Sequence, residues 1–321
     1  MRTPMLRGPL HEDGYRPKLS GHETFPLRYG WLKKAFDAVS TGGVDAEGRS
    51  VFLSEDAIAR FGVGRNMVAS MRHWAVAARV IEEAGRKPAP TELGRRLFTD
   101  DGLDPYMEVP TTTWLVHWRL CGNPQNTTWF WAFGHYPATT FVRDALAGGI
   151  EKLAKDRDWP RASHTTIGND VKCFVRSYVR RPASSKASYE DALESPLTEL
   201  GLIRSAGSRD SFRFTRGRKP TLGTGVFALA VSEFWAEYSA AGTLSFEALA
   251  HEPGSPGRVF LLDEDSLADR LLRIEEDTLG AYRWSETAGL KQLIRARTLD
   301  ANEVLDLIKQ DYVSSGREEA V

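Results

Sequence analysis

Residues 52–64 read FLSEDAIARFGVG, and residues 65–98 read RNMVASMRHWAVAARVIEEAGRKPAPTELGRRLF. Together they have the pattern of a winged helix-turn-helix. Ser54 is a suitable cap for a short helix that ends at the glycines following Phe61. A second helix is expected from Arg65 to Arg79. An apolar pair, a basic turn and a return segment rich in proline follow, which is the order of a β-hairpin wing.

The second of these helices has two distinct faces. Apolar side chains recur at helical spacing on one face, at Met67, Met71, Trp74, Ala75 and Ala78. The opposite face carries polar side chains that suit phosphates and base edges, namely Arg65, Asn66, Arg72, His73 and Arg79. We therefore predict that this face contacts DNA. The alternatives are an ordinary amphipathic surface helix and a winged helix that docks another protein.

A second winged module is predicted within residues 163–219. A helix is expected over residues 166–180 and another over residues 191–200, followed by a short hairpin that includes residues 211–215. Phe212 and Phe214 alternate with Arg213, so the rings and the cation should point to opposite faces. The hairpin and its exit hold the densest group of cations, predicted to bind DNA: Arg209, Arg213, Arg216, Arg218 and Lys219. The alternative is a solvated charged face.

Charge is segregated along the chain although the net charge is only −1. Residues 60–96 hold eight Arg or Lys against three Glu, and residues 157–219 hold thirteen against seven Asp or Glu. Residues 233–321 reverse the balance, with nine basic against eighteen acidic residues. The basic blocks predict faces that attract phosphates, and the acidic end is expected to face away from DNA or toward a partner protein.

The remaining segments complete a mainly α fold with short β-hairpins, an α+β protein with tandem winged helix-turn-helix modules. The aromatic run over residues 106–150 is interpreted as core. The end of the chain is expected to form a helix over residues 244–250, a strand over residues 258–262 and a helix from Asp265. Four domains are predicted: an N-terminal segment (1–50), a winged module (51–105), an aromatic-rich region with the second winged module (106–240), and an acidic C-terminal module (241–321).

Several classes of protein are excluded by what the sequence lacks. No run of about 18 apolar residues exists, so we expect no membrane span, and the first ten residues do not resemble a signal peptide. Two cysteines, Cys121 and Cys173, do not form a disulfide framework. The sequence has no phosphate-binding loop, dinucleotide fingerprint, paired-cysteine zinc motif or serine-hydrolase elbow. A cytoplasmic location is the default expectation.

The run Gly21-His22-Glu23-Thr24-Phe25, followed closely by Arg28, Lys33 and Lys34, concentrates groups able to act on a phosphodiester. His22 is predicted as a general base, Arg28 as a clamp for phosphate oxygens, and Glu23 as the group that orients His22 or holds a divalent metal. Lys33 and Lys34 are predicted phosphate anchors. Two alternatives remain open. In the first, the run positions DNA without catalysis; in the second, it is structural, with Glu23 capping a helix or pairing with Arg28.

These motifs together resemble the SspB proteins, the DNA-nicking component of single-stranded DNA phosphorothioation systems in bacteria. The resemblance begins with Gly21–Phe25 and with residues between 27 and 34. It includes Phe61–Val68 together with Arg72 and Trp74. It also includes Trp114, His117 and Trp118. It continues downstream at three short motifs: Leu200–Ile203, Ser255–Phe260 and Thr287–Leu290.

The resemblance implies that the protein nicks duplex DNA so that sulfur can replace a non-bridging phosphate oxygen. It implies partners that include a cysteine desulfurase and an ATP-using sulfur transferase. Magnesium or manganese is a possible cofactor, and a homodimer is plausible because winged modules often pair around a two-fold axis. The alternative function is a non-catalytic winged-helix DNA-binding adaptor or transcription regulator, and a third is a scaffold that docks other modification proteins.

Overall fold

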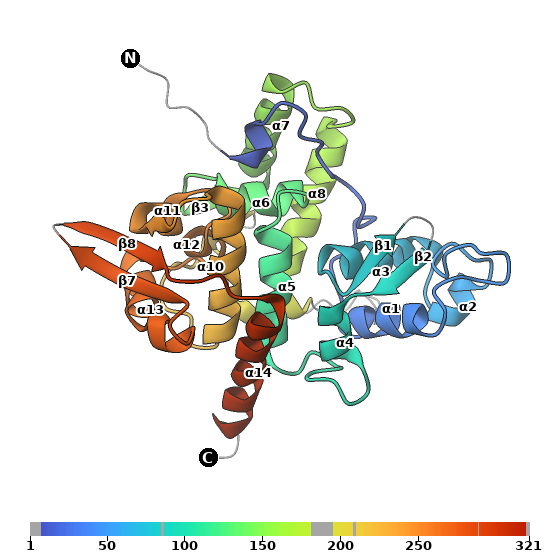
Figure 1. Ribbon diagram of the computed structural model, residues 1–321. Helices are drawn as coiled ribbons and strands as arrows, with labels where there is room; N and C mark the ends of the chain where they lie inside the picture. Colours follow the sequence, from blue (N-terminus) through green and yellow to red (C-terminus); the bar gives the residue numbers. More distant parts are fainter. Residues whose placement is uncertain (1–7, 85–86, 181–194, 208–209, 288, 319–321) are drawn as a thin grey trace.

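The computed structural model describes residues 8–84, 87–180, 195–207, 210–287 and 289–318. The chain is about half helical and carries three small antiparallel sheets, which confirms the α+β class predicted from the sequence. Figure 1 shows the N-terminal elements on one side, the helices of the middle of the chain at the centre, and the C-terminal elements on the other side.

The N-terminal unit contains the predicted helix–helix–hairpin segment. Its elements are α1 (Trp31–Ser40), α2 (Ala57–Phe61), α3 (Arg65–Ala77), the hairpin β1 (Ile81–Ala84) and β2 (Lys87–Pro90), and α4 (Glu92–Phe98). Gly62 adopts a left-handed conformation that ends α2, as the glycines in the sequence predicted. Gly94 packs where a side chain has no room, since a Cβ would lie 2.1 Å from the carbonyl oxygen of Val80.

The middle unit begins with two buried helices and ends with a sheet. Its elements are α5 (Pro110–Cys121), α6 (Thr127–Gly134), β3 (Thr140–Val142), α7 (Arg143–Asp156), α8 (His164–Tyr178), the 3-10 helix η2 (Pro196–Leu200), β4 (Ile203–Ser205) and β5 (Ser211–Phe214). The strands lie in the order β3-β5-β4. Phe212 and Phe214 are buried while Arg213 is exposed, which confirms the predicted alternation. The helix predicted over residues 191–200 lies partly outside the described residues, and its described end is η2.

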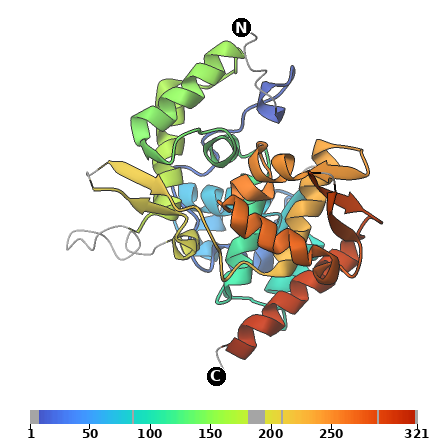
Figure 2. The same ribbon diagram turned by 90° about the vertical axis from the view of Figure 1, so that its left-hand side faces the viewer.

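The C-terminal unit, like the middle unit, has helices between the first strand of its sheet and the other two. It comprises α10 (Thr224–Tyr238), β6 (Thr243–Ser245), α11 (Phe246–His251), α12 (Pro256–Val259), α13 (Glu264–Asp277), β7 (Tyr282–Thr287), β8 (Leu290–Arg295) and α14 (Ala301–Glu318). Its sheet order, β6-β8-β7, is equivalent to that of the middle unit. Figure 2 shows the two sheets projecting in opposite directions from the helices between them.

One prediction for this C-terminal unit is wrong, and one of its hairpins was missed. The strand predicted over residues 258–262 is replaced by the short helix α12, because the Ser255 side chain accepts from the amide of Arg258 and Pro256 occupies the first helical turn. The hairpin β7–β8 was not predicted, since its polar residues hide the alternation of Tyr282 and Trp284. The acidic triplet at residues 263–265 does start a helix, with Asp263 accepting from the amide of Ser266.

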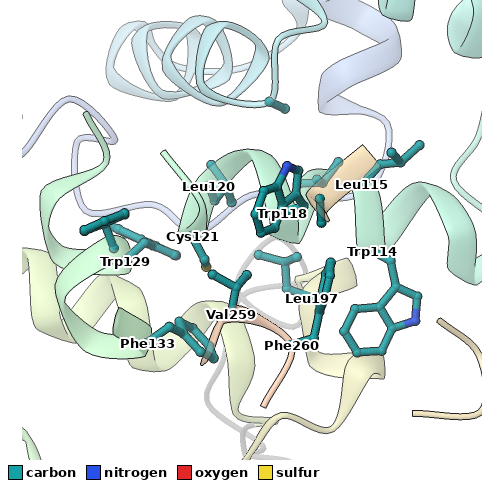
Figure 3. Packing of buried hydrophobic residues seen from close by; sticks show 14 of the residues in the cluster. Trp114, Leu115, Trp118, Leu120, Cys121, Trp129, Phe133, Leu197, Val259 and Phe260 are labelled. Atoms are coloured by element: carbon teal, nitrogen blue, oxygen red, sulfur yellow. The ribbon is translucent and has the colours of Figure 1, made fainter. Parts of the chain in front are cut away.

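The core is one continuous cluster centred on α5 and α6. Figure 3 shows Trp114 and Trp118 of α5, Trp129 and Phe133 of α6, and Phe260 packed together. The aromatic run is therefore core, as predicted. His117 is fully buried there, and its Nε2 donates to the carbonyl of Val259 at 2.8 Å while Nδ1 accepts from the Tyr178 hydroxyl at 2.8 Å. This network ties α5 to α8 and to the C-terminal unit.

Candidate nucleic-acid interface

The turn at Ser20–Phe25 has an unusual backbone. Ser20, Glu23 and Thr24 have φ angles of 64°, 45° and 67°, values that a β-branched residue such as Thr24 rarely adopts. The amide of Phe25 donates to the carbonyl of His22 at 2.8 Å, and Arg176 donates to the carbonyl of Thr24 at 3.2 Å. The surrounding structure therefore holds a conformation that is unfavourable by itself.

A buried carboxylate anchors this turn to the middle unit. Asp170 on α8 accepts from the amide of Ser20 at 2.7 Å, from His22 Nε2 at 3.0 Å and from the hydroxyl of Thr128 at 3.0 Å. The amide of Thr24 donates to His22 Nδ1 at 3.0 Å, so the proton of the imidazole resides on Nε2. Asp170 is thus a structural acceptor.

The same turn also contacts α3 of the N-terminal unit. The carbonyl of Phe25 accepts from the indole of Trp74 at 3.0 Å, and the ring of His22 lies 5.8 Å from that of His73. The turn therefore joins the N-terminal and middle units. We call the cluster of Ser20, His22, Thr128 and Asp170 the joint.

The three residues predicted to be catalytic are not brought together in one accessible place. His22 is 1% exposed with both ring nitrogens engaged, a geometry that does not suit a general base acting on water. Arg28 is 3% exposed, and its guanidinium lies 5.7 Å from the Phe25 ring and 5.5 Å from the Trp31 ring. Glu23 is the exposed member of the three. Within the described part of the chain, no three His, Cys, Asp or Glu side chains gather as metal ligands.

The predicted DNA contacts of α3 divide into two groups. Arg65 and Asn66, at the start of the helix, are exposed to solvent. Arg72 forms an ion pair with Glu83 of β1, and Arg79 lies 3.7 Å from Glu233 of α10. His73 packs beneath Gly21, where burial, with smaller effects from His22 and Lys18, lowers the pKa of His73 to about 3.

The two predicted lysine anchors differ in their surroundings. Lys33 bonds to Asp37 at 2.7 Å and to Asp100 at 2.8 Å, so two carboxylates already neutralise it. Lys34 is exposed and donates to the carbonyl of Phe61 at 3.4 Å. Of this pair, Lys34 is the cation presented to solvent.

The hairpin β4–β5 presents an unusual pair of cations. Arg213 lies directly opposite Arg204 in the strand register, and both side chains are exposed. Neither forms an ion pair with any of the residues that the structure describes. Arg204 was not predicted from the sequence, although the alternation around β5 would have placed it beside Arg213. Arg218 is also exposed, whereas Arg209 lies outside the described residues.

The cations that follow β5 contact backbone carbonyls. Lys219 is 7% exposed and donates to the carbonyls of Thr215, Gly217 and Leu261 at 2.8–3.1 Å. Burial lowers the pKa of Lys219 to about 8, against the opposing effect of Asp263. Arg216 donates to the carbonyl of Leu262 at 3.3 Å. Lys219 and Arg216 therefore fasten the middle unit to the C-terminal unit.

A groove lies between α7 and α8 and has a volume of about 470 Å³. Arg143, Asp144 and Glu151 line it from α7, Asn169 and Lys172 from α8. The turn of the β4–β5 hairpin borders the groove through Asp210, which forms an ion pair with Arg143. The groove and the arginine pair thus belong to the same unit.

Fold and site together define an α+β protein whose N-terminal, middle and C-terminal segments are joined by buried polar side chains. Residues 19–312 match the family described as Protein of unknown function (DUF4007). A magnesium ion-bound SspB crystal structure shares the fold with a TM-score of 0.79 at 30% sequence identity, covering 94% of this chain and 90% of that chain. A second SspB crystal structure gives a TM-score of 0.77 at 29% identity, covering 95% and 96% of the two chains.

The chain therefore belongs to the DUF4007 family, and the resemblance to SspB predicted from its sequence is confirmed. No curated protein matches the sequence. Among the described helices, none is both long and apolar enough to cross a membrane.

Proposed function

We propose that this protein binds duplex DNA and nicks it within a phosphorothioation system, in the role that the resemblance to SspB implies. The observation that carries the DNA-binding part is the pairing of Arg204 with Arg213 across β4 and β5. Like charges directly opposite each other destabilise a sheet, and a phosphate bound between two guanidinium groups would relieve that repulsion.

The arrangement of the three units supports the proposal that they are tandem winged helices. In the described part of each unit, helices precede an antiparallel hairpin, and in the middle and C-terminal units a short strand adds a third member to the sheet. Winged helices bind DNA with the second helix and the hairpin, and the unpaired arginines lie on such a hairpin.

The nicking part of the proposal comes from the family resemblance. Of the three predicted catalytic residues, Glu23 is the one whose carboxylate reaches solvent, so we assign it the direct role, as a ligand for magnesium or manganese or as a base. His22 and Arg28 are assigned the task of holding the turn that presents Glu23. The sulfur-donating partners, a cysteine desulfurase and an ATP-using sulfur transferase, would act on the opened strand.

The experiment uses supercoiled plasmid, with magnesium, with manganese and with neither. We expect the wild type to relax the plasmid, Glu23→Gln to bind it without relaxing it, and the double variant Arg204→Ala/Arg213→Ala to lose both binding and relaxation. Arg283→Ala, an exposed cation on β7 of the acidic C-terminal unit, is the matched control and should behave as wild type.

A wild-type protein that binds the plasmid but relaxes none of it, with either metal, would favour the non-catalytic adaptor or regulator. The burial of His22 in the joint is the observation that favours this second candidate. A double arginine variant that binds as tightly as wild type would refute the assigned DNA surface.

A further inference from the structure

We propose that α8 is the helix that reads base edges, by placing its solvent face and the groove beside it against the major groove of duplex DNA. The inference rests on the proposed DNA binding and goes beyond it, because it assigns sequence recognition to a helix other than α3. Four observations support it: the position of α8 in its unit, a helical glycine with free space around it, two polar side chains that form no hydrogen bond within the described residues, and the charge and contacts of the equivalent helices α3 and α13.

The position of α8 matches that of a recognition helix. Of the described α-helices it is the last before the hairpin of its unit, with η2 between them, and α3 and α13 are likewise the last before theirs. One face of α8 is buried through Ile167, Val171 and Phe174. The opposite face carries Thr165, Gly168, Asn169 and Lys172, whose spacing places them side by side.

Gly168 lies in the interior of this helix and has no packing reason to be glycine. A Cβ built at this position would meet no atom within 4 Å. Glycine lowers helix stability relative to alanine, so its presence favours a close approach by something outside the chain. The groove therefore has free space beside Gly168, where a base edge could approach the helix backbone.

The neighbours of Gly168 supply chemistry suited to a base pair and a phosphate. Asn169 and Lys172 form no side-chain hydrogen bond with any residue in the described ranges. An asparagine amide can bond to adenine in a bidentate manner in the major groove, and a lysine ammonium binds phosphate. On the α7 wall, the carboxylates of Asp144 and Glu151 can accept from the amino group of cytosine, although Glu151 also accepts from His164 at 2.6 Å.

The wing that accompanies α8 lies within reach of the same duplex. Asp210 lines the groove and Arg213 follows three residues later on β5, a separation of about 10 Å at the rise of a strand. The backbone of one duplex can therefore contact Arg213 and Arg204 while α8 occupies its groove.

The two competing helices are less suitable. On α3, Arg72 is paired with Glu83, His73 is covered by Gly21, and Arg79 lies beside Glu233. The third helix, α13, carries six Asp or Glu against two Arg, a balance that repels phosphates.

The test selects sequences from a duplex with a randomised centre, first with the wild-type protein and then with each variant. Asn169→Ala should lose preference at one position by about tenfold, with little change in affinity for unselected duplex. Lys172→Ala should weaken binding to every duplex and reduce the slope of log affinity against log salt by about 0.9. Lys152→Ala, an exposed lysine of α7 outside the groove, is the control and should change neither.

Gly168→Ala gives a second readout that separates folding from recognition. It should raise the melting temperature, because alanine favours the helix, and yet weaken DNA binding, because its methyl group fills the contact surface. Wild-type binding with unchanged preference in Asn169→Ala and unchanged affinity in Gly168→Ala would overturn the inference and leave the proposed function intact. A wild-type protein that binds no duplex at low salt would overturn both.

Discussion

Replacing His22 with alanine distinguishes a joint from a catalytic centre. The change removes a ring that is 1% exposed and deletes its hydrogen bond to Asp170 at 3.0 Å. Asp170 then keeps its bonds to Ser20 and Thr128 but loses one partner of a buried charge. Removing a buried ring and leaving a buried carboxylate short of one hydrogen-bond donor together cost about 4 kcal/mol, so His22→Ala should lower the free energy of unfolding by that amount.

Thermal and urea unfolding followed by circular dichroism measure this effect. At about 1.5 °C per kcal/mol for a chain of 321 residues, the melting temperature should fall by about 6 °C. Glu23→Ala is the matched control on the adjacent residue. Its side chain is exposed, so the free energy of unfolding should stay within about 0.5 kcal/mol of wild type.

The result that would refute this reasoning is a stable His22→Ala protein. Unfolding at the wild-type temperature, combined with binding but no relaxation of supercoiled plasmid, would return His22 to the catalytic role predicted from the sequence. Equal destabilisation by His22→Ala and Glu23→Ala would also contradict the structure.

Three further outcomes are expected from chemical denaturation. Burial lowers the pKa of His73 to about 3 and, with the Val259 carbonyl opposing it, that of His117 to about 4, while the unfolded chain takes up protons below pH 6.5. The free energy of unfolding should therefore fall by about 1.4 kcal/mol per pH unit for each histidine as pH decreases. A free energy of unfolding that stays constant from pH 6.5 to about pH 5 would argue against burial of the neutral rings. Burial raises the pKa of Glu233, but Arg119 and its other donors outweigh burial and hold the pKa below 4.5, so the stability that Glu233 contributes is present above pH 4.5 and is lost as pH falls through the folded pKa. Glu233→Gln should therefore be less stable than wild type at neutral pH and approach it in acid. Equal stability at neutral pH would show that the pair of Glu233 and Arg119 contributes nothing. Gly168→Ala should raise the free energy of unfolding by about 1 kcal/mol, and a decrease would mean that the open space above the glycine is absent.

The α+β class and several helices and strands were predictable because they depend on local signals. The apolar spacing from Met67 to Ala78 and the glycine at position 62 determine where α2 ends and which face of α3 is buried. The alternation around Arg213 likewise predicted β5. The hairpin β7–β8 was missed because its strands are mostly exposed, so polar residues outnumber and hide the alternation of Tyr282 and Trp284.

The environment of the site was not predictable, because it depends on contacts between distant residues. The sequence alone indicates a reactive imidazole at His22. In the structure, this buried imidazole donates to Asp170, which lies 148 residues away in the sequence. Lys219 belongs to a basic run, yet the carbonyl of Leu261 on the next unit takes up its ammonium. Sequence spacing identifies such residues but does not reveal what covers them.

The most direct test of the central claim is a salt titration of duplex DNA binding by wild type and by Arg204→Ala/Arg213→Ala. If both arginines contact phosphates, the slope of log affinity against log salt should become shallower by about 1.8 in the double variant, while its melting temperature stays at or above that of wild type. An unchanged slope would mean that this hairpin does not touch the DNA backbone, and the assignment of the interface to the middle unit would be wrong.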